Sequence, residues 1–176
     1  MSKETIPLRK DVPAEYKWDL SSIYKSDDEW EADLKAIPAA TEKLASYKGR
    51  LGESKEVLLE ALQADQALDM LLENVYHYAN LINESDQSDS KAQDMVNRAM
   101  MAYTQAGAAS SFYVPELLSI PDDKINNWIE GDEFKDFKIY VKKLLHRNHT
   151  CLQKRKKSFW HFNLNRDKQQ VQHSAS

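Results

Sequence analysis

The chain has 176 residues, of which 41% are hydrophobic and 30% charged, a balance typical of one globular domain or a large piece of one. Only four glycines and five prolines occur, which argues against a turn-rich β architecture, and no stretch is apolar over the length that a transmembrane helix needs. Residues 1–9 lack the apolar core of a signal peptide, and the single cysteine, Cys151, excludes an internal disulfide framework, so we expect a cytoplasmic protein.

Charge is distributed unevenly along the chain. The formal net charge is −4, but residues 151–176 contain six Lys or Arg and one Asp, which makes +5 and leaves −9 for residues 1–150. An acidic body argues against nucleic-acid binding. The run from Lys154 to Lys157 could be a nucleic-acid or localisation patch, and Trp160 and Phe162 could stack on bases, but a solvated, largely disordered tail is the simpler interpretation. We expect neither nucleic acid nor a membrane as a partner.

The first part of the chain predicts an extended arm followed by a kinked helix. Residues 9–24 mix proline, aromatic and charged residues, and four apolar side chains should pack this arm: Tyr16, Trp18, Leu20 and Tyr24. Ser26 can cap a helix that continues to about Lys48, with an acidic first turn. Its buried stripe would be Trp30, Leu34, Ile37 and Leu44. Pro38 should kink or divide this helix, and Gly49 and Gly52 should end it.

Two long apolar patterns predict an antiparallel helical hairpin. After a cap at Ser54, apolar residues recur at alternating intervals of three and four, on one seam: Ala61, Ala64, Leu68, Leu71, Val75, Tyr78 and Ile82. A helix from Lys55 to about Asn83 would be roughly 43 Å long. A polar turn over residues 84–90 leads to a second seam of small residues: Ala92, Val96, Ala99, Tyr103, Ala106 and Ser110. The short connection favours antiparallel packing.

The rest of the body predicts two shorter helices. Pro115 should break the chain, Pro121 should open a helix through Trp128, and Gly131 should close it. Asp132 could cap the last helix, whose inner side would carry Phe134, Phe137, Val141, Leu144 and Leu145. The predicted fold is therefore all-α, with an N-terminal extended arm, a kinked helix, a long antiparallel helical hairpin and two shorter helices, in one lobe over residues 1–150.

Several short phrases, taken in order and with their spacing, resemble a known family. They are Arg9–Pro13, Tyr16–Leu20, Ser26–Trp30, Tyr47–Gly49, Tyr78–Ala79, Ser111–Phe112, Pro115–Leu118 and His149–Thr150. Over about residues 9–150 the chain resembles the N-terminal region of oligoendopeptidase F proteins. The resemblance implies the helical N-terminal lobe of a cytoplasmic zinc metallopeptidase, of the thimet-oligopeptidase type, that cleaves short peptides inside a deep channel. Such a lobe walls the channel and limits the size of the substrate.

The chemistry of that family rests on a His-Glu-x-x-His helix, in which two His bind zinc and the first Glu activates the zinc-bound water. None of the five His residues in this chain is followed by Glu. No catalytic, cofactor-binding or metal residue is therefore carried over, and zinc would belong to the intact parent. The resemblance implies an oligopeptide substrate and a catalytic domain as the parent's partners. An isolated lobe should be inactive and should tend to self-associate, since the surface that the catalytic domain covers would meet water.

The tail departs from the family, in which the His-Thr pair is usually followed by a phrase like Leu-Ser-x-Glu-Glu-Glu-x-Leu-Leu-Ala. When the third base of each codon is joined to the first two bases of the next, Phe159 into Trp160 must encode Leu and Trp160 into His161 must encode Ala. Earlier shifted codons permit Leu-Ser and a run of Glu. Residues 151–176 are thus interpreted as an out-of-frame, basic and disordered tail.

Other residues have two interpretations each. His77 could touch a substrate, but a partly buried structural histidine is the simpler expectation. His146 and His149 are three apart, and a helix-end role is preferred to a metal site. Met95, Met100 and Met101 could line a binding groove, with core filling as the default. The alternative to a peptidase lobe is an autonomous helical protein-interaction module, and a displaced catalytic reading frame directly downstream would distinguish the two.

Overall fold

A computed structural model describes residues 12–147, and every regular element among them is helical. The elements are the 3₁₀ turn η2 (Ala14–Tyr16), α1 (Asp27–Ala45), α2 (Lys55–Ser85), α3 (Ser90–Ser110), α4 (Tyr113–Leu117), α5 (Asp122–Trp128), the 3₁₀ turn η3 (Asp132–Phe134), and helical residues 138–147. The prediction of an all-α fold is confirmed. The chain divides into two compact units, with the boundary between Glu116 and Leu117.

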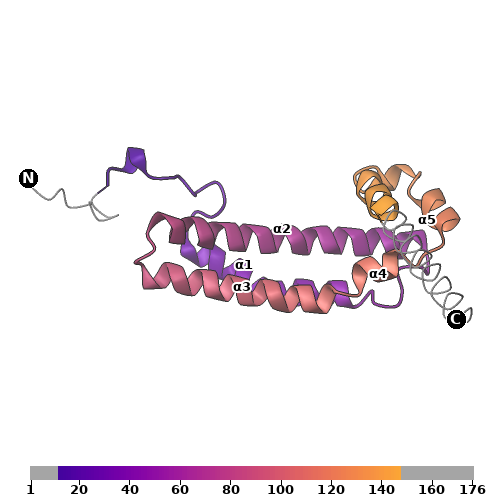
Figure 1. The fold of residues 1–176 in the computed structure, drawn as a ribbon, viewed down its shortest axis with the longest axis horizontal. Helices are drawn as coiled ribbons and strands as arrows, with labels where there is room; N and C mark the ends of the chain where they lie inside the picture. Colours follow the sequence, from indigo (N-terminus) through magenta and orange to yellow (C-terminus); the bar gives the residue numbers. More distant parts are fainter. Residues whose placement is uncertain (1–11, 148–176) are drawn as a thin grey trace, which may run out of the picture. The chain divides into compact units, whose positions relative to one another are not determined.

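The first unit is built from α1, α2 and α3, which pack against one another (Figure 1). The predicted caps are present, because the hydroxyls of Ser26 and Ser54 accept hydrogen bonds from the backbone amides of Glu29 and Val57. Residues 86–89 join α2 to α3, so the two form the expected hairpin. Within the part of the chain that the structure describes, no helix combines the length and the apolar character needed to cross a membrane.

The core stripe of α2 is wider than the predicted seam. Five of the seven predicted positions are buried, whereas Leu71 and Ile82 are only half-buried. The additional buried residues are Leu58, Leu62, Leu72 and Ala79. The reason is that α2 packs against both α1 and α3, which demands a broader apolar face than one coiled-coil seam. On α3, Met95 is buried, while the predicted core residue Tyr103 is 45% exposed.

The arm and α1 differ from expectation in detail. Pro38 lies inside α1, which passes through it as one helix and ends at Ala45 rather than Lys48. Gly49 adopts a φ of 81°, the left-handed conformation that favours glycine. The prediction that Tyr16 and Trp18 pack the arm is wrong, since they are 72% and 62% exposed. Both side chains face solvent because no other element of the described part of this unit packs over them.

The second unit contains α5, η3 and the helical residues 138–147. Helix α5 begins after Pro121 and ends at Trp128, as predicted. Two expectations are wrong. Pro115 lies within the short helix α4, in its first turn, where a missing amide costs no hydrogen bond. The last predicted helix is split, since η3 follows Gly131 directly and the α-helical part starts only at residue 138.

Candidate functional site

A buried tryptophan fixes α1 on the hairpin. Trp30 is fully buried, and its indole Nε1 donates a hydrogen bond of 2.8 Å to the backbone carbonyl of Val75 in α2. The guanidinium of Arg98, from α3, lies 5.3 Å from the centre of the Trp30 ring system. One side chain of α1 thus contacts both other helices of the unit, which sets the spacing of the grooves between them.

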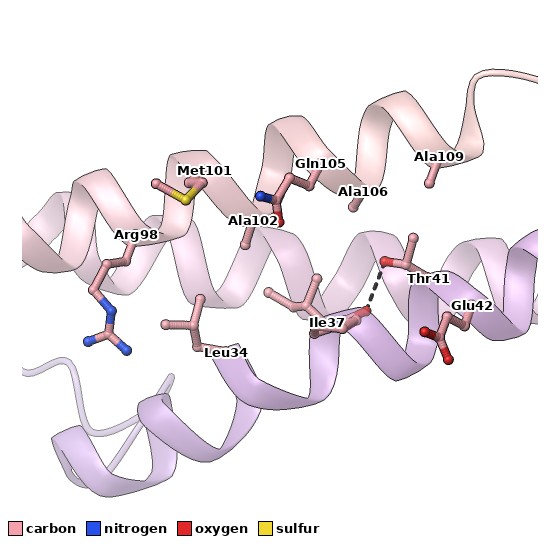
Figure 2. A pocket seen from close by; sticks show the side chains of 11 residues that line it. Leu34, Ile37, Thr41, Glu42, Arg98, Met101, Ala102, Gln105, Ala106 and Ala109 are labelled. Carbon is pink, nitrogen blue, oxygen red and sulfur yellow. Dashed lines mark hydrogen bonds between the residues drawn. The ribbon is translucent and has the colours of Figure 1, made fainter.

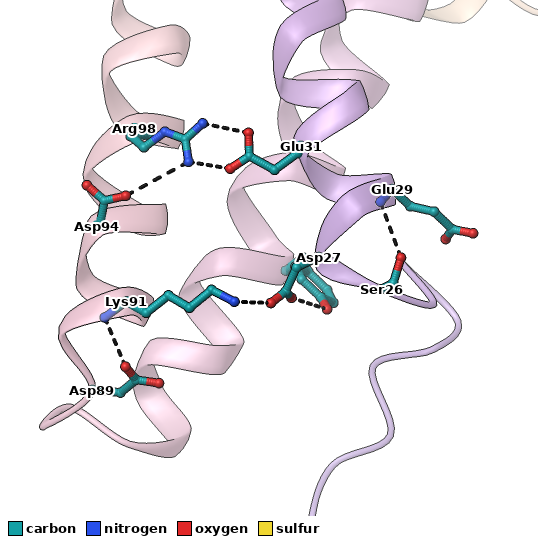
Figure 3. Close-up of polar contacts among 9 residues, drawn as sticks. Ser26, Asp27, Glu29, Glu31, Asp89, Lys91, Asp94 and Arg98 are labelled. Carbon is teal, nitrogen blue, oxygen red and sulfur yellow. Dashed lines mark hydrogen bonds and ion pairs between the residues drawn. The ribbon is translucent and has the colours of Figure 1, made fainter.

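Two ion pairs connect α1 to α3 (Figure 3). Arg98 donates to both carboxylate oxygens of Glu31, with 2.7 Å between Nη2 and Oε2, and lies 3.9 Å from Asp94. Lys91 donates to Asp27 at 2.6 Å. These hydrogen bonds from cations lower the pKa of Glu31 and of Asp27 below their usual values. All these groups already have partners, so they hold helices together rather than forming a free reactive centre.

A groove runs between α1 and α3, with Arg98 at one end of it (Figure 2). Its volume is about 440 Å³, and it is lined by Leu34, Ile37, Pro38, Thr41, Glu42, Arg98, Met101, Ala102, Gln105, Ala106 and Ala109. Small side chains of α3 leave the space open, and Met101 at its edge is 61% exposed. An open apolar groove of this kind is suited to receive another protein segment.

A second groove lies between α2 and α3. This α2–α3 groove is lined by Glu73, Tyr76, His77, Met100 and Tyr103, and its volume is about 330 Å³. The rings of Tyr76 and Tyr103 lie 6.4 Å apart, and His77 stacks edge-on against Tyr76 at 5.8 Å. Aromatic rings and a methionine at the surface offer contact area to a ligand at small entropic cost.

The singled-out residues therefore divide between core and surface. Met95 fills the core, as expected, but Met100 and Met101 are exposed and line the two grooves, so core filling is wrong for both. His77 is exposed rather than partly buried. His146 lies in the helical residues 138–147. His149, Cys151 and the basic tail lie outside the described residues.

Glu116 has a structural role that the sequence did not reveal, because it binds the loop that follows α1. Its two carboxylate oxygens accept hydrogen bonds from the backbone amides of Gly49 and Leu51, at 2.8 and 2.9 Å. The loop after α1 is thereby held against α4. Two of the phrases that carried the resemblance, Tyr47–Gly49 and Pro115–Leu118, thus meet in one contact, which only the fold could reveal.

A row of carboxylates, here called the acidic row, follows α2 beside the second groove. Asp65, Asp69 and Glu73 occur at intervals of four residues and so share one face of the helix. Burial, together with the negative charge of Asp69, raises the pKa of Asp65 to about 7. Burial and the charge of Glu73 also raise the pKa of Asp69.

Asp65→Asn should stabilise the chain near pH 8. The pKa of Asp65 in the folded chain, about 7, lies above the unfolded value of 3.8, so folding favours the protonated carboxyl. Its contribution to the free energy of unfolding is therefore complete at low pH and is lost as the pH rises from about 4 to about 7. After allowance for partial exposure, the gain at pH 8 should be about 1 to 2 kcal/mol and should vanish below pH 4. Urea denaturation at several pH values measures it. Asp136→Asn, at an exposed site, should shift stability by less than about 0.5 kcal/mol at either pH.

The side chains of residues 12–147 do not assemble a zinc site. The sequence contains no His-Glu-x-x-His, and no group of three or more His, Cys, Asp or Glu among residues 12–147 is placed to hold a metal ion. The acidic row offers carboxylates without histidine or cysteine, which is not the ligand set that zinc prefers. What the arrangement can do is bind other polypeptide segments in its two grooves.

Comparison with known proteins gives a consistent result. The chain is 36% identical over 131 residues to "Oligopeptidase PepF" of Bacillus subtilis (strain 168), which covers 74% of this chain and 20% of that protein. It is 31% identical over 152 residues to "Oligoendopeptidase F, plasmid" of Lactococcus lactis subsp. cremoris, covering 85% of this chain and 25% of the relative. No family model matches.

The fold also occurs in a solved structure. The crystal structure of oligoendopeptidase-F from Enterococcus faecium superimposes with a TM-score of 0.64 at 23% identity, over 69% of this chain and 24% of the other. The chain thus spans only about a fifth to a quarter of the length of the proteins that it matches.

Proposed function

This chain belongs to the oligoendopeptidase F family and covers a fifth to a quarter of its relatives' length, and from that premise we propose that it forms the N-terminal lobe of a zinc metalloendopeptidase that cleaves short peptides. The observation that carries the proposal is the match of 36% identity over 131 residues to a named oligopeptidase, in a chain that lacks a zinc-binding motif of its own. The lobe would wall the substrate channel, while zinc and the catalytic residues would belong to the catalytic domain. We place the protein in the cytoplasm.

Exposed apolar side chains support a catalytic domain as the partner of this lobe. Tyr16, Trp18 and Met101 are each more than half exposed, and Met101 borders an open groove. Large apolar side chains at the surface, one of them at the edge of an open groove, offer contact area to such a partner. The isolated chain would accordingly be inactive and would tend to self-associate.

We further propose that residues 151–176 are read out of frame and that residues 1–150 are the lobe. The support is the forced Leu-Ala of the shifted codons at Phe159, Trp160 and His161. Resequencing the coding DNA from codon 140 onward tests it. A single insertion or deletion near codon 150, followed by a frame that encodes His-Glu-x-x-His, is expected. A genuine frame with nothing peptidase-like downstream would instead support an autonomous interaction module.

A chimeric enzyme tests the proposed function directly. Residues 12–147 replace the matching segment of the Bacillus subtilis oligopeptidase, and cleavage of a short fluorogenic peptide is measured. We expect activity within about tenfold of the parent, because a lobe that only walls the channel leaves the zinc site unchanged. The 176-residue chain alone should show neither cleavage nor bound zinc above background.

The control chimera carries Trp30→Ala, which should unfold the lobe and remove activity together with cooperative melting. A chimera that melts cooperatively and binds zinc, yet cleaves nothing, would overturn the assignment. That result would favour the alternative, an autonomous helical interaction module, and would direct the search to a separate partner.

A further inference from the structure

The α2–α3 groove has the composition of a binding surface. Met100 and Tyr103 are 46% and 45% exposed, and together with Tyr76 they give apolar walls to a cavity of about 330 Å³. Glu73 lies in the wall that α2 contributes, at one end of the acidic row. The groove therefore presents apolar contacts from α2 and α3 next to the carboxylate of Glu73, from which the acidic row continues along α2.

The charge of the acidic row is not neutralised within the described part of the chain. No Lys or Arg among residues 12–147 forms an ion pair with Asp65, Asp69 or Glu73, whereas the acidic residues between α1 and α3 are paired. Burial is the main reason why the pKa of Asp65 and of Asp69 is raised, and the neighbouring carboxylate on α2 adds to the rise in each case. Carboxylates without a cationic partner, of which Glu73 lies directly in the groove wall, are electrostatically complementary to a cationic ligand.

The spacing of the row suits an extended peptide. Residues four apart on a helix are about 6 Å apart along its axis. Alternate residues of an extended chain are about 6.7 Å apart and point to the same side. A peptide lying along the groove could thus direct every second side chain to the carboxylates of α2. The intervening side chains would point to the apolar wall of α3.

We propose that the α2–α3 groove binds a cationic oligopeptide, with its Arg or Lys side chains on Asp65, Asp69 and Glu73 and its apolar side chains against Tyr76, Met100 and Tyr103. This inference rests on the proposed function, since it gives the lobe a preference among peptide substrates. The groove takes the positively charged part of the substrate, and its contacts are independent of zinc.

The test uses the full 176-residue chain, labelled with nitrogen-15, and the blocked heptapeptide Ala-Arg-Leu-Arg-Leu-Arg-Ala. Binding should shift the amide signals of α2 and α3 around the groove and should weaken as salt is added. A peptide with Gln in place of every Arg should bind about tenfold more weakly. The double substitution Asp69→Asn with Glu73→Gln should cause a similar loss. Asp65 is left unchanged because its substitution alters stability.

The matched control is Glu15→Gln with Asp136→Asn, which removes the same number of charges from exposed positions that line neither groove. Its affinity for the heptapeptide should stay within about twofold of the unsubstituted chain, since a distant exposed charge is screened. Equal weakening by both double variants would overturn the proposal, because binding would then follow net charge alone. Absence of binding by the unsubstituted chain, shown folded by its spectrum, would also overturn it.

The chimeric enzyme separates this inference from the proposed function. If the chimera cleaves a neutral peptide and the isolated chain ignores the cationic heptapeptide, the lobe assignment stands and the groove proposal fails. If the heptapeptide binds at the groove and a folded chimera cleaves nothing, the groove is a peptide-binding surface and the peptidase assignment fails.

Discussion

Replacement of Trp30 by Ala should destabilise the three-helix unit by about 3 to 5 kcal/mol, the largest loss expected from one substitution in this chain. The side chain is completely buried, so its removal leaves a cavity between three helices. The change also removes the ring against which the Arg98 guanidinium lies, with 5.3 Å between the guanidinium carbon and the ring centre. A loss of this size is comparable to the whole stability of many small domains, so the variant should be largely unfolded.

Urea denaturation followed by far-ultraviolet circular dichroism measures this effect. Trp30→Phe should cost less than Trp30→Ala, because it retains an apolar ring and loses the hydrogen bond from Nε1 to the Val75 carbonyl, at 2.8 Å, and only part of the buried volume. Trp18→Ala is the matched control, since Trp18 is 62% exposed and its removal should change stability by no more than about 0.5 kcal/mol. Similar losses from Trp18→Ala and Trp30→Ala would contradict the central position of Trp30.

Glu116→Ala should destabilise the same unit by about 2 to 3 kcal/mol, which is the second largest effect that we expect. Its carboxylate is the acceptor for two backbone amides, of Gly49 and Leu51, and both would lose that acceptor. Hydrogen bonds to a charged acceptor are about twice as strong as neutral ones. Glu116→Gln retains one carbonyl acceptor without the charge, so its cost should be about half as large.

Amide hydrogen exchange gives a local readout of this contact. The amides of Gly49 and Leu51 should exchange faster in Glu116→Ala, while amides in the middle of α2 should change only as far as global stability changes. Glu53→Ala is the control in the same loop. Glu53 pairs with Arg50 at 3.2 Å, but both side chains are about half exposed, so the cost should be about 0.5 kcal/mol or less. Unchanged exchange at Gly49 would contradict the proposed role of Glu116.

Local sequence signals were sufficient to predict most helices. The caps at Ser26 and Ser54 and the start of α5 after Pro121 were correct because each depends on a few neighbouring residues. The turn between α2 and α3 follows from a short polar interval in an otherwise periodic pattern. Errors arose where a residue's environment depends on other elements, as for the exposed Trp18 and the exposed Met101.

The surfaces were harder to predict for the same reason. A three-four repeat identifies one buried face, but it does not say how many neighbours a helix has, and so Tyr103, Met100 and Met101 were assigned to the core. The acidic row was visible as a four-residue interval, yet its proximity to the tyrosines of the groove required the hairpin to be known. Glu116 gave no local signal, because its partners lie 65 and 67 positions away in the sequence.

The ion pair between Glu31 and Arg98 has a consequence for synthesis on the ribosome. The two residues are 67 positions apart, so α1 leaves the ribosome well before its partner on α3 has been made. At about 5 to 20 residues per second, the delay is about 3 to 13 s. Until Val75 of α2 has been made, 45 positions after Trp30, the apolar face of α1 has no partner helix, and the side that faces α3 waits longer still. The nascent chain therefore passes through a stage in which chaperone binding competes with aggregation, and α1 can only dock once most of the hairpin is complete.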